Sequence, residues 1–255
     1  MHDISYIILY RDNGDMYREE NLRTVLRWIF KNKLTDILDI IVVEQDSISK
    51  INLSEEITHI FVKNTGPFNR SWGFNVGAFQ TESRYLIFSD SDIIMPLDSF
   101  LNALSGLRNY DTVKTYKENL IFPSEEDSNL LRETLDTSLD LKGNRPGRAA
   151  CTPFCGGVFF ITQEGFQRIG GWDEEFEGWG GEDEAIESRI YKFLRHQRFD
   201  DRAFHLFHQP AQVDPNLHRK NVEIMHRIFN LKGDELEKYC SQNLKNIGKT
   251  SKYEK

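Results

Sequence analysis

The sequence predicts an α/β protein in which helices cover a mostly parallel sheet. Short apolar segments bounded by polar residues recur through the first ninety or so residues, as expected for buried strands. Between them stand stretches whose apolar residues have helical spacing. This strand–helix–strand alternation is typical of sheets that bind ligands beyond the carboxyl ends of their strands.

The first half of the chain begins with a predicted strand at Ile4–Tyr10, a short apolar run ended by polar residues. Leu22 to Phe30 then carries apolar residues at helical spacing, which predicts a helix. The same two patterns predict further strands at Leu38–Glu44, Ile57–Val62 and Tyr85–Phe88, and a short helix at Asn69–Ala78. Arg11, Asp46 and Asp90 follow strands, so we expect a nucleotide-binding half here.

Residues 105–150 are less regular and more charged, with one predicted helix at Asp127–Leu139 and a Gly- and Pro-rich loop at 142–148. That loop is either a lid or acceptor-contacting insert, or a solvated excursion. The pattern then resumes with a strand, a short helix ended by two glycines, and a longer amphipathic helix, at Val158–Ile161, Gln163–Ile169 and from Gly181 to near Leu194. From Asn216 we expect one or two helices, and a lysine-rich frayed end after Asn246.

Composition narrows the classes of function. The 255 residues carry 32 Lys and Arg against 40 Asp and Glu, a formal net charge of −8. A general nucleic-acid surface is therefore not expected, although a local basic pocket for one diphosphate is not excluded. The apolar run Ile4–Tyr10 is too short to span a membrane and lacks a basic flank. We expect no membrane span; the lysines near the C-terminus leave open a peripheral contact with an anionic membrane, beside a solvated tail.

The three cysteines, Cys151, Cys155 and Cys240, are an odd number in a long chain. This argues against a disulfide scaffold and favours a reducing compartment, so we expect a cytoplasmic protein, with the inner face of the membrane as the other possibility. A C-x3-C pair without further ligands is weak evidence for a metal site. Buried or inert thiols are the simpler interpretation.

Asp90-Ser91-Asp92 follows a predicted strand. Asp90 and Asp92 share a face if the strand stays regular, whereas a turn would separate their roles, one at a metal and the other at the ribose or sugar. Hard oxygen ligands suit Mg²⁺ or Mn²⁺ on a diphosphate, although this short pattern also arises by chance. The absence of G-x-G-x-x-G argues against a dinucleotide dehydrogenase.

His205 and His208 add imidazole to the candidate ligands. An extended segment would not place both rings on one face, but a bent loop would. Imidazole together with carboxylate favours Mn²⁺ over Mg²⁺. Ordinary surface or core histidines are the alternative.

Glu182 and Asp183 open the predicted helix that ends near Leu194, after two glycines. Acidic residues are favoured at helix N-termini by the dipole, which is the plain interpretation. The functional one is a general base beside a backbone that a substrate can approach closely. Trp179 lies between glycines, which suits an apolar wall for a sugar ring better than a core position.

Five blocks, in order, resemble the β-1,4-galactosyltransferase-like enzymes of the GT-A fold, and more distantly the chondroitin-polymerase and polypeptide N-acetylgalactosaminyltransferase catalytic domains. The blocks are Y-R-D-N at 10–13, F-N-R at 68–70 with N-V-G at 75–77, F-S-D-S-D at 88–92, G-G-V at 156–158 and G-W-G-G-E-D at 178–183. The resemblance implies one GT-A domain over residues 1–230, with a nucleotide-binding half at 1–95 and an acceptor-binding half at 96–230. Residues 231–255 would form a C-terminal helical tail.

The resemblance also implies roles on the donor side. Arg11 and Arg70 would contact the nucleotide or its phosphates, and Phe68 would pack on the uracil. Within the 90–92 block, Asp90 and Ser91 would face the donor sugar or ribose, and Asp92 would ligate Mn²⁺.

The second half would supply the remaining groups. His208 matches the family's histidine metal ligand, and His205 falls near a further ligand. Trp179 would lie on a mobile loop that closes over the donor. The acceptor sugar would be bound by Gly181, Glu182, Asp183 and Arg219. Asp183 would be the base, with Glu182 beside it.

The chain also departs from the family pattern. Asn13 stands where the family has a second arginine, and Phe154-Cys155 replaces a Tyr-Phe pair linked to the choice between galactose and its N-acetylated form. The family's vertebrate membrane anchor and stem are absent, which would fit a bacterial-type enzyme of polysaccharide biosynthesis.

The resemblance therefore implies a Mn²⁺-dependent (or Mg²⁺-dependent) inverting transfer of a hexose or N-acetylhexosamine, with galactose or N-acetylgalactosamine favoured. The donor would be a UDP-sugar and the acceptor a saccharide hydroxyl. Two rivals remain: a non-catalytic nucleotide- or sugar-binding module of the same fold, and a metal-dependent phosphohydrolase that uses the same acids.

Overall fold

A computed structural model describes residues 2–143, 152–210 and 212–254. Cys151 and positions 144–148 of the expected loop lie outside the described residues. Within them, Cys155 and Cys240 are free and buried, as the sequence predicts. No helix in the described ranges combines the length and the apolar character that a membrane crossing requires.

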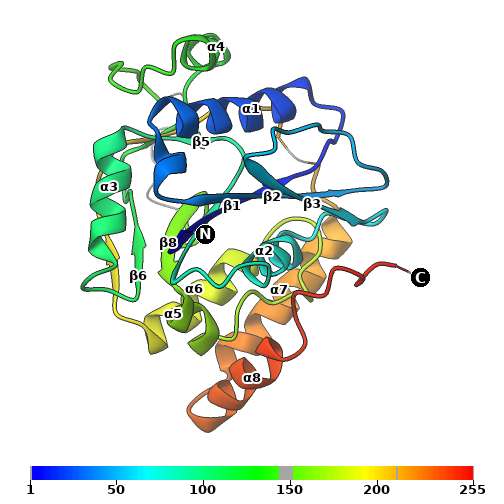
Figure 1. Cartoon of the computed structure of the whole chain (residues 1–255). Helices are drawn as coiled ribbons and strands as arrows, with labels where there is room; N and C mark the ends of the chain where they lie inside the picture. Colours follow the sequence, from blue (N-terminus) through cyan, green and yellow to red (C-terminus); the bar gives the residue numbers. More distant parts are fainter. Residues whose placement is uncertain (1, 144–151, 211, 255) are drawn as a thin grey trace.

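The central sheet has seven strands in the order β3-β2-β1-β4-β8-β6-β9 (Figure 1). Their bounds are β1 Ile4–Tyr10, β2 Asp39–Asp46, β3 Ile57–Lys63, β4 Tyr85–Ser89, β6 Thr112–Lys114, β8 Val158–Thr162 and β9 His196–Arg198. Strands β3, β2, β1 and β4 pair in parallel, whereas β8 is antiparallel to both of its neighbours. The predicted mostly parallel sheet is confirmed.

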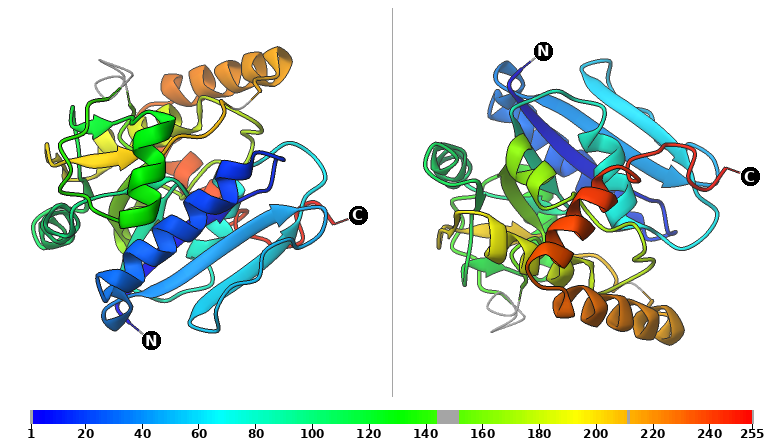
Figure 2. Two further views of the ribbon diagram at one scale, coloured as in Figure 1. Left: turned by 90° about the horizontal axis from the view of Figure 1, so that it is seen from above. Right: turned by 90° about the horizontal axis from the view of Figure 1, so that it is seen from below.

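Helices cover both faces of this sheet. Their bounds are α1 Met16–Lys31, η1 Leu34–Asp36, α2 Arg70–Ala78, α3 Leu97–Gly106, α4 Glu125–Thr134, α5 Gln163–Arg168, α6 Glu182–Phe193, α7 Pro215–Asn230 and α8 Asp234–Leu244. Seen from above, α1 crosses the strands; seen from below, α2 and α8 lie in front of them (Figure 2).

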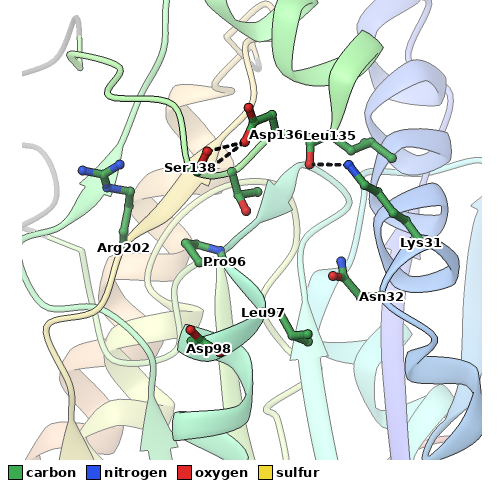
Figure 3. A pocket seen from close by; sticks show the side chains of 10 residues that line it. Lys31, Asn32, Pro96, Leu97, Asp98, Leu135, Asp136, Ser138 and Arg202 are labelled. Carbon is green, nitrogen blue, oxygen red and sulfur yellow. Dashed lines mark hydrogen bonds between the residues drawn. The ribbon is translucent and has the colours of Figure 1, made fainter.

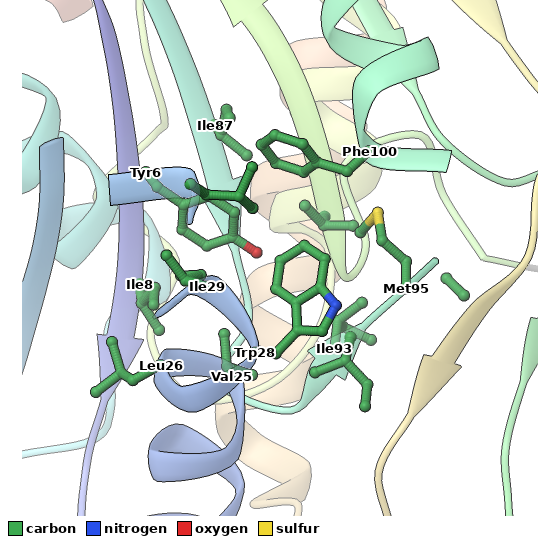
Figure 4. Packing of buried hydrophobic residues seen from close by; sticks show 14 of the residues in the cluster. Tyr6, Ile8, Val25, Leu26, Trp28, Ile29, Ile87, Ile93, Met95 and Phe100 are labelled. Carbon is green, nitrogen blue, oxygen red and sulfur yellow. The ribbon is translucent and has the colours of Figure 1, made fainter. Parts of the chain in front are cut away.

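The alternation of side chains along β1 explains why both faces need helices. Tyr6 and Ile8 belong to a core shared with α1 and α3, where Trp28 and Phe100 are fully buried (Figure 4). Ile7, between them in sequence, belongs to the opposite core, shared with α2, α5 and α6. A strand buried on both faces reads as a continuous apolar run, which is why it is recognisable in the sequence.

A small second sheet brings distant segments together. It has the order β5-β10-β7, with β5 at Ile93–Ile94, β7 at Leu120–Ile121 and β10 at Ala203–His205. The register pairs His205 with Ile93, and the Leu206 N–H donates to the Asp92 carbonyl oxygen over 2.8 Å. This pairing fixes the segment that follows β4 against the segment that contains both histidines.

The predicted elements of the first half and from Val158 onward correspond to structural elements, with ends shifted by a few residues or less where a limit was given. The expected helix at Asp127–Leu139 is instead Glu125–Thr134, because Ser124 caps its start and Leu135 turns left-handed at its end. Strands β5, β6, β7, β9 and β10 and helix α3 were not predicted.

The expected frayed end after Asn246 is wrong, because this segment packs against α2. The indole N–H of Trp72 donates to the Lys249 carbonyl oxygen over 2.7 Å, and Tyr253 packs edge-on against Trp72. Lys252 donates to the Glu174 carbonyl oxygen over 3.0 Å. Partners so distant in sequence give no local signal.

Candidate active site

The predicted metal ligands form one cluster. Nε2 of His208 lies 3.3 Å from Asp92 Oδ2, and Nε2 of His205 lies 3.7 Å from Oδ1. Ligand atoms of all three residues lie within 4.8 Å of one another. The strand does not continue through Asp92, so the turn alternative holds: Asp90 and Asp92 face different partners.

The hydrogen bonds of the two imidazoles leave Nε2 of each ring available to bind a cation. Nδ1 of His205 lies 3.2 Å from the Leu206 carbonyl oxygen, and Nδ1 of His208 lies 2.7 Å from that of Gln209. A carbonyl only accepts, so each Nδ1 carries the proton and a neutral ring leaves the Nε2 lone pair free. The buried Asp92 Oδ1 has no hydrogen-bond donor. This donor set fits Mn²⁺.

Charges around Asp92 set the protonation of the cluster. Burial acts to raise the pKa of Asp92, but the positive charges that His205 and His208 carry when protonated, together with that of Arg18, outweigh it and the pKa falls below its usual value. Burial lowers the pKa of His208, which keeps this ring neutral. Both ligands are thus in the protonation state that binds a metal.

Arg70 joins the two acidic segments. Its Nε donates to Asp90 over 2.9 Å and its Nη1 donates to Asp183 over 2.7 Å. Nη2 lies 3.3 Å from the Cys155 carbonyl oxygen and donates to it. Burial acts to lower the pKa of Arg70, but the charges of Asp183, Asp90 and Glu182 raise it, so the guanidinium stays charged.

The start of α6 presents the two predicted acids. Gly181 caps the helix with φ of 92°, a left-handed conformation that glycine adopts without strain. Burial, and then the charge of Asp183, raises the pKa of Glu182, and its buried Oε2 has no hydrogen-bond partner. Burial also raises the pKa of Asp183, against the opposing effect of Arg70. A carboxylate with a raised pKa is a better proton acceptor.

Trp179 is half exposed on the loop before α6. Its ring lies 5.5 Å from that of His218 on α7. Arg219, the predicted acceptor contact, is exposed on the same helix. His218 was not singled out in the sequence, where only the position of Trp179 pointed to this face.

The donor-side residues follow strands β1, β3 and β4 in the sequence. Arg11 is half-buried, and its Nη1 has no hydrogen-bond partner. Phe68 is also half-buried, and its carbonyl oxygen accepts from the Gly178 N–H over 2.8 Å, which places it beside the Trp179 loop. Ser91 is buried between the two aspartates.

Sequence reasoning missed three charged residues around this site: Arg18, Lys114 and Arg198. Arg18 lies 3.6 Å from Asp92 Oδ2, and Arg198 pairs with Glu187 on α6 over 2.5 Å. Lys114 is completely buried at the end of β6. No local pattern marks any of them.

A cavity of about 430 Å³ lies away from these residues, between α1, α4 and the start of α3 (Figure 3). Its cations already have partners, since Lys31 donates to the Leu135 carbonyl oxygen and Arg202 to that of Leu139. A hollow of about 30 Å³ borders His205 and His208. We therefore place the candidate site at the metal cluster and not in the larger cavity.

Comparisons with known proteins show which family and which fold the chain resembles. A family model described as the N-terminal domain of galactosyltransferase matches residues 147–209, a range that contains Trp179, Glu182, Asp183 and both histidines. The zebrafish (Danio rerio) β-1,4-galactosyltransferase 5 is 30% identical over 129 residues. That alignment covers 49% of this chain and 26% of the relative, so the chain matches only about a quarter of the curated protein's length.

Solved structures share the fold over most of the chain. A mutant Drosophila β1,4-galactosyltransferase 7, in complex with manganese, UDP-Gal and xylobiose, has a TM-score of 0.54 at 16% identity, over 92% of this chain and 82% of that one. GalNAc-T7 with UDP, GalNAc and Mn²⁺ has a TM-score of 0.59 at 16% identity, over 93% of this chain and 49% of that one. The chain is therefore galactosyltransferase-like and has the GT-A fold of glycosyltransferases.

Proposed function

We propose that this chain is a metal-dependent, inverting glycosyltransferase. It moves a hexose or N-acetylhexosamine, galactose or N-acetylgalactosamine in preference, from a UDP-sugar to a hydroxyl of a saccharide acceptor. The observation that carries the proposal is the pair of clusters: Asp92 with two histidines, and Asp183 held by Arg70. The division into a donor half up to residue 95 and an acceptor half after it belongs to the same proposal.

Asp183 is the general base in this proposal. Arg70 occupies Oδ1, which leaves Oδ2 to accept the proton of the attacking hydroxyl. The raised pKa of Asp183 gives it affinity for that proton. The hydroxyl attacks the anomeric carbon on the face opposite UDP, and one displacement inverts the centre.

Asp92, His205 and His208 hold the cation in this proposal. When bound, it neutralises negative charge on the departing diphosphate. Arg11 and Phe68 bind the nucleotide, Asp90 orients the ribose or sugar, and Trp179 excludes water above the sugar. Orientation by such contacts contributes up to about 7–11 kcal/mol in favourable cases.

The test is a panel of UDP-sugars with Mn²⁺, followed by UDP release with and without a pool of simple acceptor sugars. We expect release that depends on both acceptor and metal, with one donor preferred. Tight Mn²⁺-dependent UDP binding without transfer would favour the non-catalytic module. Phosphate release, or donor cleavage no faster with acceptor, would favour the phosphohydrolase.

A further inference from the structure

Lys114 is a buried cation that the proposed mechanism does not use. It ends β6, its side chain is inaccessible to solvent, and its ammonium lies 4.5 Å from the centre of the Tyr116 ring. Burial, and then the charge of Arg198, lowers the pKa of Lys114 to about 7. A buried lysine is unfavourable unless its donors are satisfied, so its partners indicate what it does.

Those partners are two carbonyl oxygens of one loop. Nζ of Lys114 donates to the Pro153 carbonyl oxygen over 2.5 Å and to that of Gly156 over 2.8 Å. The Tyr116 hydroxyl donates to the same Gly156 oxygen over 2.8 Å. Residues Pro153 to Gly156, which precede β8, are called the 153–156 loop below.

Other charged side chains hold the two residues in the middle of this loop. The Phe154 N–H donates to Glu187 over 2.8 Å, and the Cys155 carbonyl oxygen accepts from Arg70. Each of the four loop residues thus has a backbone group bonded to a charged side chain. Loops at the protein surface are usually more mobile than the elements they connect, whereas these hydrogen bonds hold the backbone of this loop at each of its four residues.

The 153–156 loop lies directly against the proposed base. A Cβ at Gly156 would stand 3.3 Å from Asp183 Oδ2, the oxygen that Arg70 leaves free. At the next residue, a Cβ on Gly157 would stand 2.0 Å from the Tyr116 hydroxyl oxygen, so the backbone can approach Tyr116 only without a side chain. The loop and Tyr116 therefore fit each other closely.

We propose that Lys114 is a positioning residue that fixes the 153–156 loop against Asp183 and so sets how donor sugar and acceptor hydroxyl meet. The proposal rests on the proposed function. A reacting group displaced by about 1 Å costs roughly 100-fold in rate, so a loosened loop affects turnover without removing any catalytic group.

The experiment compares Lys114→Met, which keeps the bulk of the side chain but removes the ammonium, with the parent protein. Lys31→Met is the matched control, because Lys31 also donates to two carbonyl oxygens, those of Thr134 and Leu135, away from the site. We expect Lys114→Met to lower kcat about 100-fold and to change the ratio of kcat/KM between UDP-sugars. The Mn²⁺-dependent affinity for UDP alone, which lacks the sugar, should change less than about twofold.

Hydrogen exchange followed by mass spectrometry reads the loop without requiring turnover. Amides of the peptide containing Phe154 and Gly156 should exchange faster in Lys114→Met and not in Lys31→Met. Unchanged loop exchange with unchanged kcat would overturn the proposal, and so would equal fractional losses of kcat and UDP affinity. If the parent protein transfers no sugar while the exchange effect appears, the proposed function fails and the role of Lys114 in holding the loop stands.

Tyr116→Phe gives a second, milder variant if Lys114→Met does not fold. It removes the hydroxyl that donates to the Gly156 carbonyl oxygen and accepts from the Val158 N–H, and it leaves Lys114 in place. We expect a loss of kcat of about tenfold with UDP affinity preserved. Tenfold corresponds to about 1.4 kcal/mol, near the upper end of what the one neutral hydrogen bond to the 153–156 loop contributes. Parent-like kcat and loop exchange in Tyr116→Phe would then overturn the proposal.

Discussion

Arg70 donates a 2.7 Å hydrogen bond to Asp183, across more than one hundred residues of sequence. The same guanidinium also holds Asp90, so the acid that follows β4 and the acid that opens α6 share one cation. Asp183 is thereby oriented before any substrate binds. Its remaining oxygen faces the 153–156 loop.

Arg70→Lys tests this link. A lysine cannot reproduce the planar fork that reaches both carboxylates, so we expect transfer to fall by about 100-fold or more through the misplaced base. Removing one partner of a buried ion pair lowers the free energy of unfolding by about 3–5 kcal/mol. We expect a smaller decrease for Arg70→Lys, because lysine keeps the positive charge. Steady-state kinetics and urea unfolding measure the two effects. Arg195→Lys, which alters an exposed pair with Asp111, is the control.

Asp183→Asn separates chemistry from binding. The amide keeps the shape of the carboxylate but cannot accept the proton of the hydroxyl, so we expect transfer to fall by about 10²–10⁴-fold with UDP affinity near normal. Glu184→Gln, on the same helix turn, controls for loss of one negative charge. Turnover equal to that of the parent would remove Asp183 from the role of base.

The sequence predicts the donor-side scaffold well, for a physical reason. β1 and β2 are buried on both faces, so each is a continuous apolar run whose end also marks where Arg11 and Asp46 stand. The G-W-G-G-E-D block similarly predicts acids at a helix start after two glycines, and the structure has this arrangement, with a left-handed glycine just before the acids.

The rest depends on contacts that no local pattern encodes. Strands such as β6 and β10 have three residues each and exist because long-range partners pair with them. Lys114 ends one of these strands, and its role follows only from the fold of the distant 153–156 loop. The sequence around Tyr253 is typical of a solvated tail. Nothing near it in the sequence indicates that its ring packs against Trp72 or that its hydroxyl accepts a hydrogen bond from Asn69.

Removing a histidine tests the metal cluster. We expect His208→Ala to weaken Mn²⁺ binding at least about tenfold. Removing a residue that only supports a metal ligand typically weakens metal binding by about 10–100-fold, and His208 is itself a proposed ligand. His59→Ala is the matched control, since His59 also lies against a buried carboxylate, that of Glu44, outside the cluster. Electron paramagnetic resonance of free Mn²⁺ measures the Mn²⁺ affinity of both variants. Equal UDP affinity of the parent protein with and without Mn²⁺ would contradict the site.

Tyr253→Phe tests the packed C-terminal segment. The hydroxyl accepts from Asn69 over 3.0 Å and donates to Glu177 over 2.9 Å, and Asn69 is fully buried. We expect a loss of about 1–3 kcal/mol in the free energy of unfolding, because a buried donor loses its partner. Tyr191→Phe, whose hydroxyl contact is exposed, should cost less. Equal urea midpoints for Tyr253→Phe and the parent would show that the segment does not stabilise the fold.

The buried carboxyl of Glu182 predicts how stability depends on pH. Burial and the neighbouring Asp183 raise the pKa of Glu182 from 4.5 to about 8 in the folded protein. Between these values the folded state holds a proton that the unfolded state has released, so the free energy of unfolding falls as the pH rises. One such group gives a slope of up to about 1.4 kcal/mol per pH unit between these two pKa values. The stability that it contributes is fully present below pH 4.5 and is lost as the pH rises through 8.

Glu182→Gln removes that contribution because an amide does not titrate. We expect its free energy of unfolding, measured by urea at intervals from pH 5 to 8, to fall less steeply than that of the parent. Part of the slope should remain, because burial raises the pKa of Asp183 in the same direction. Glu184→Gln should keep the parent slope. Parallel curves for Glu182→Gln and the parent would mean that Glu182 is ionised in the fold, and therefore that water or a cation reaches its Oε2.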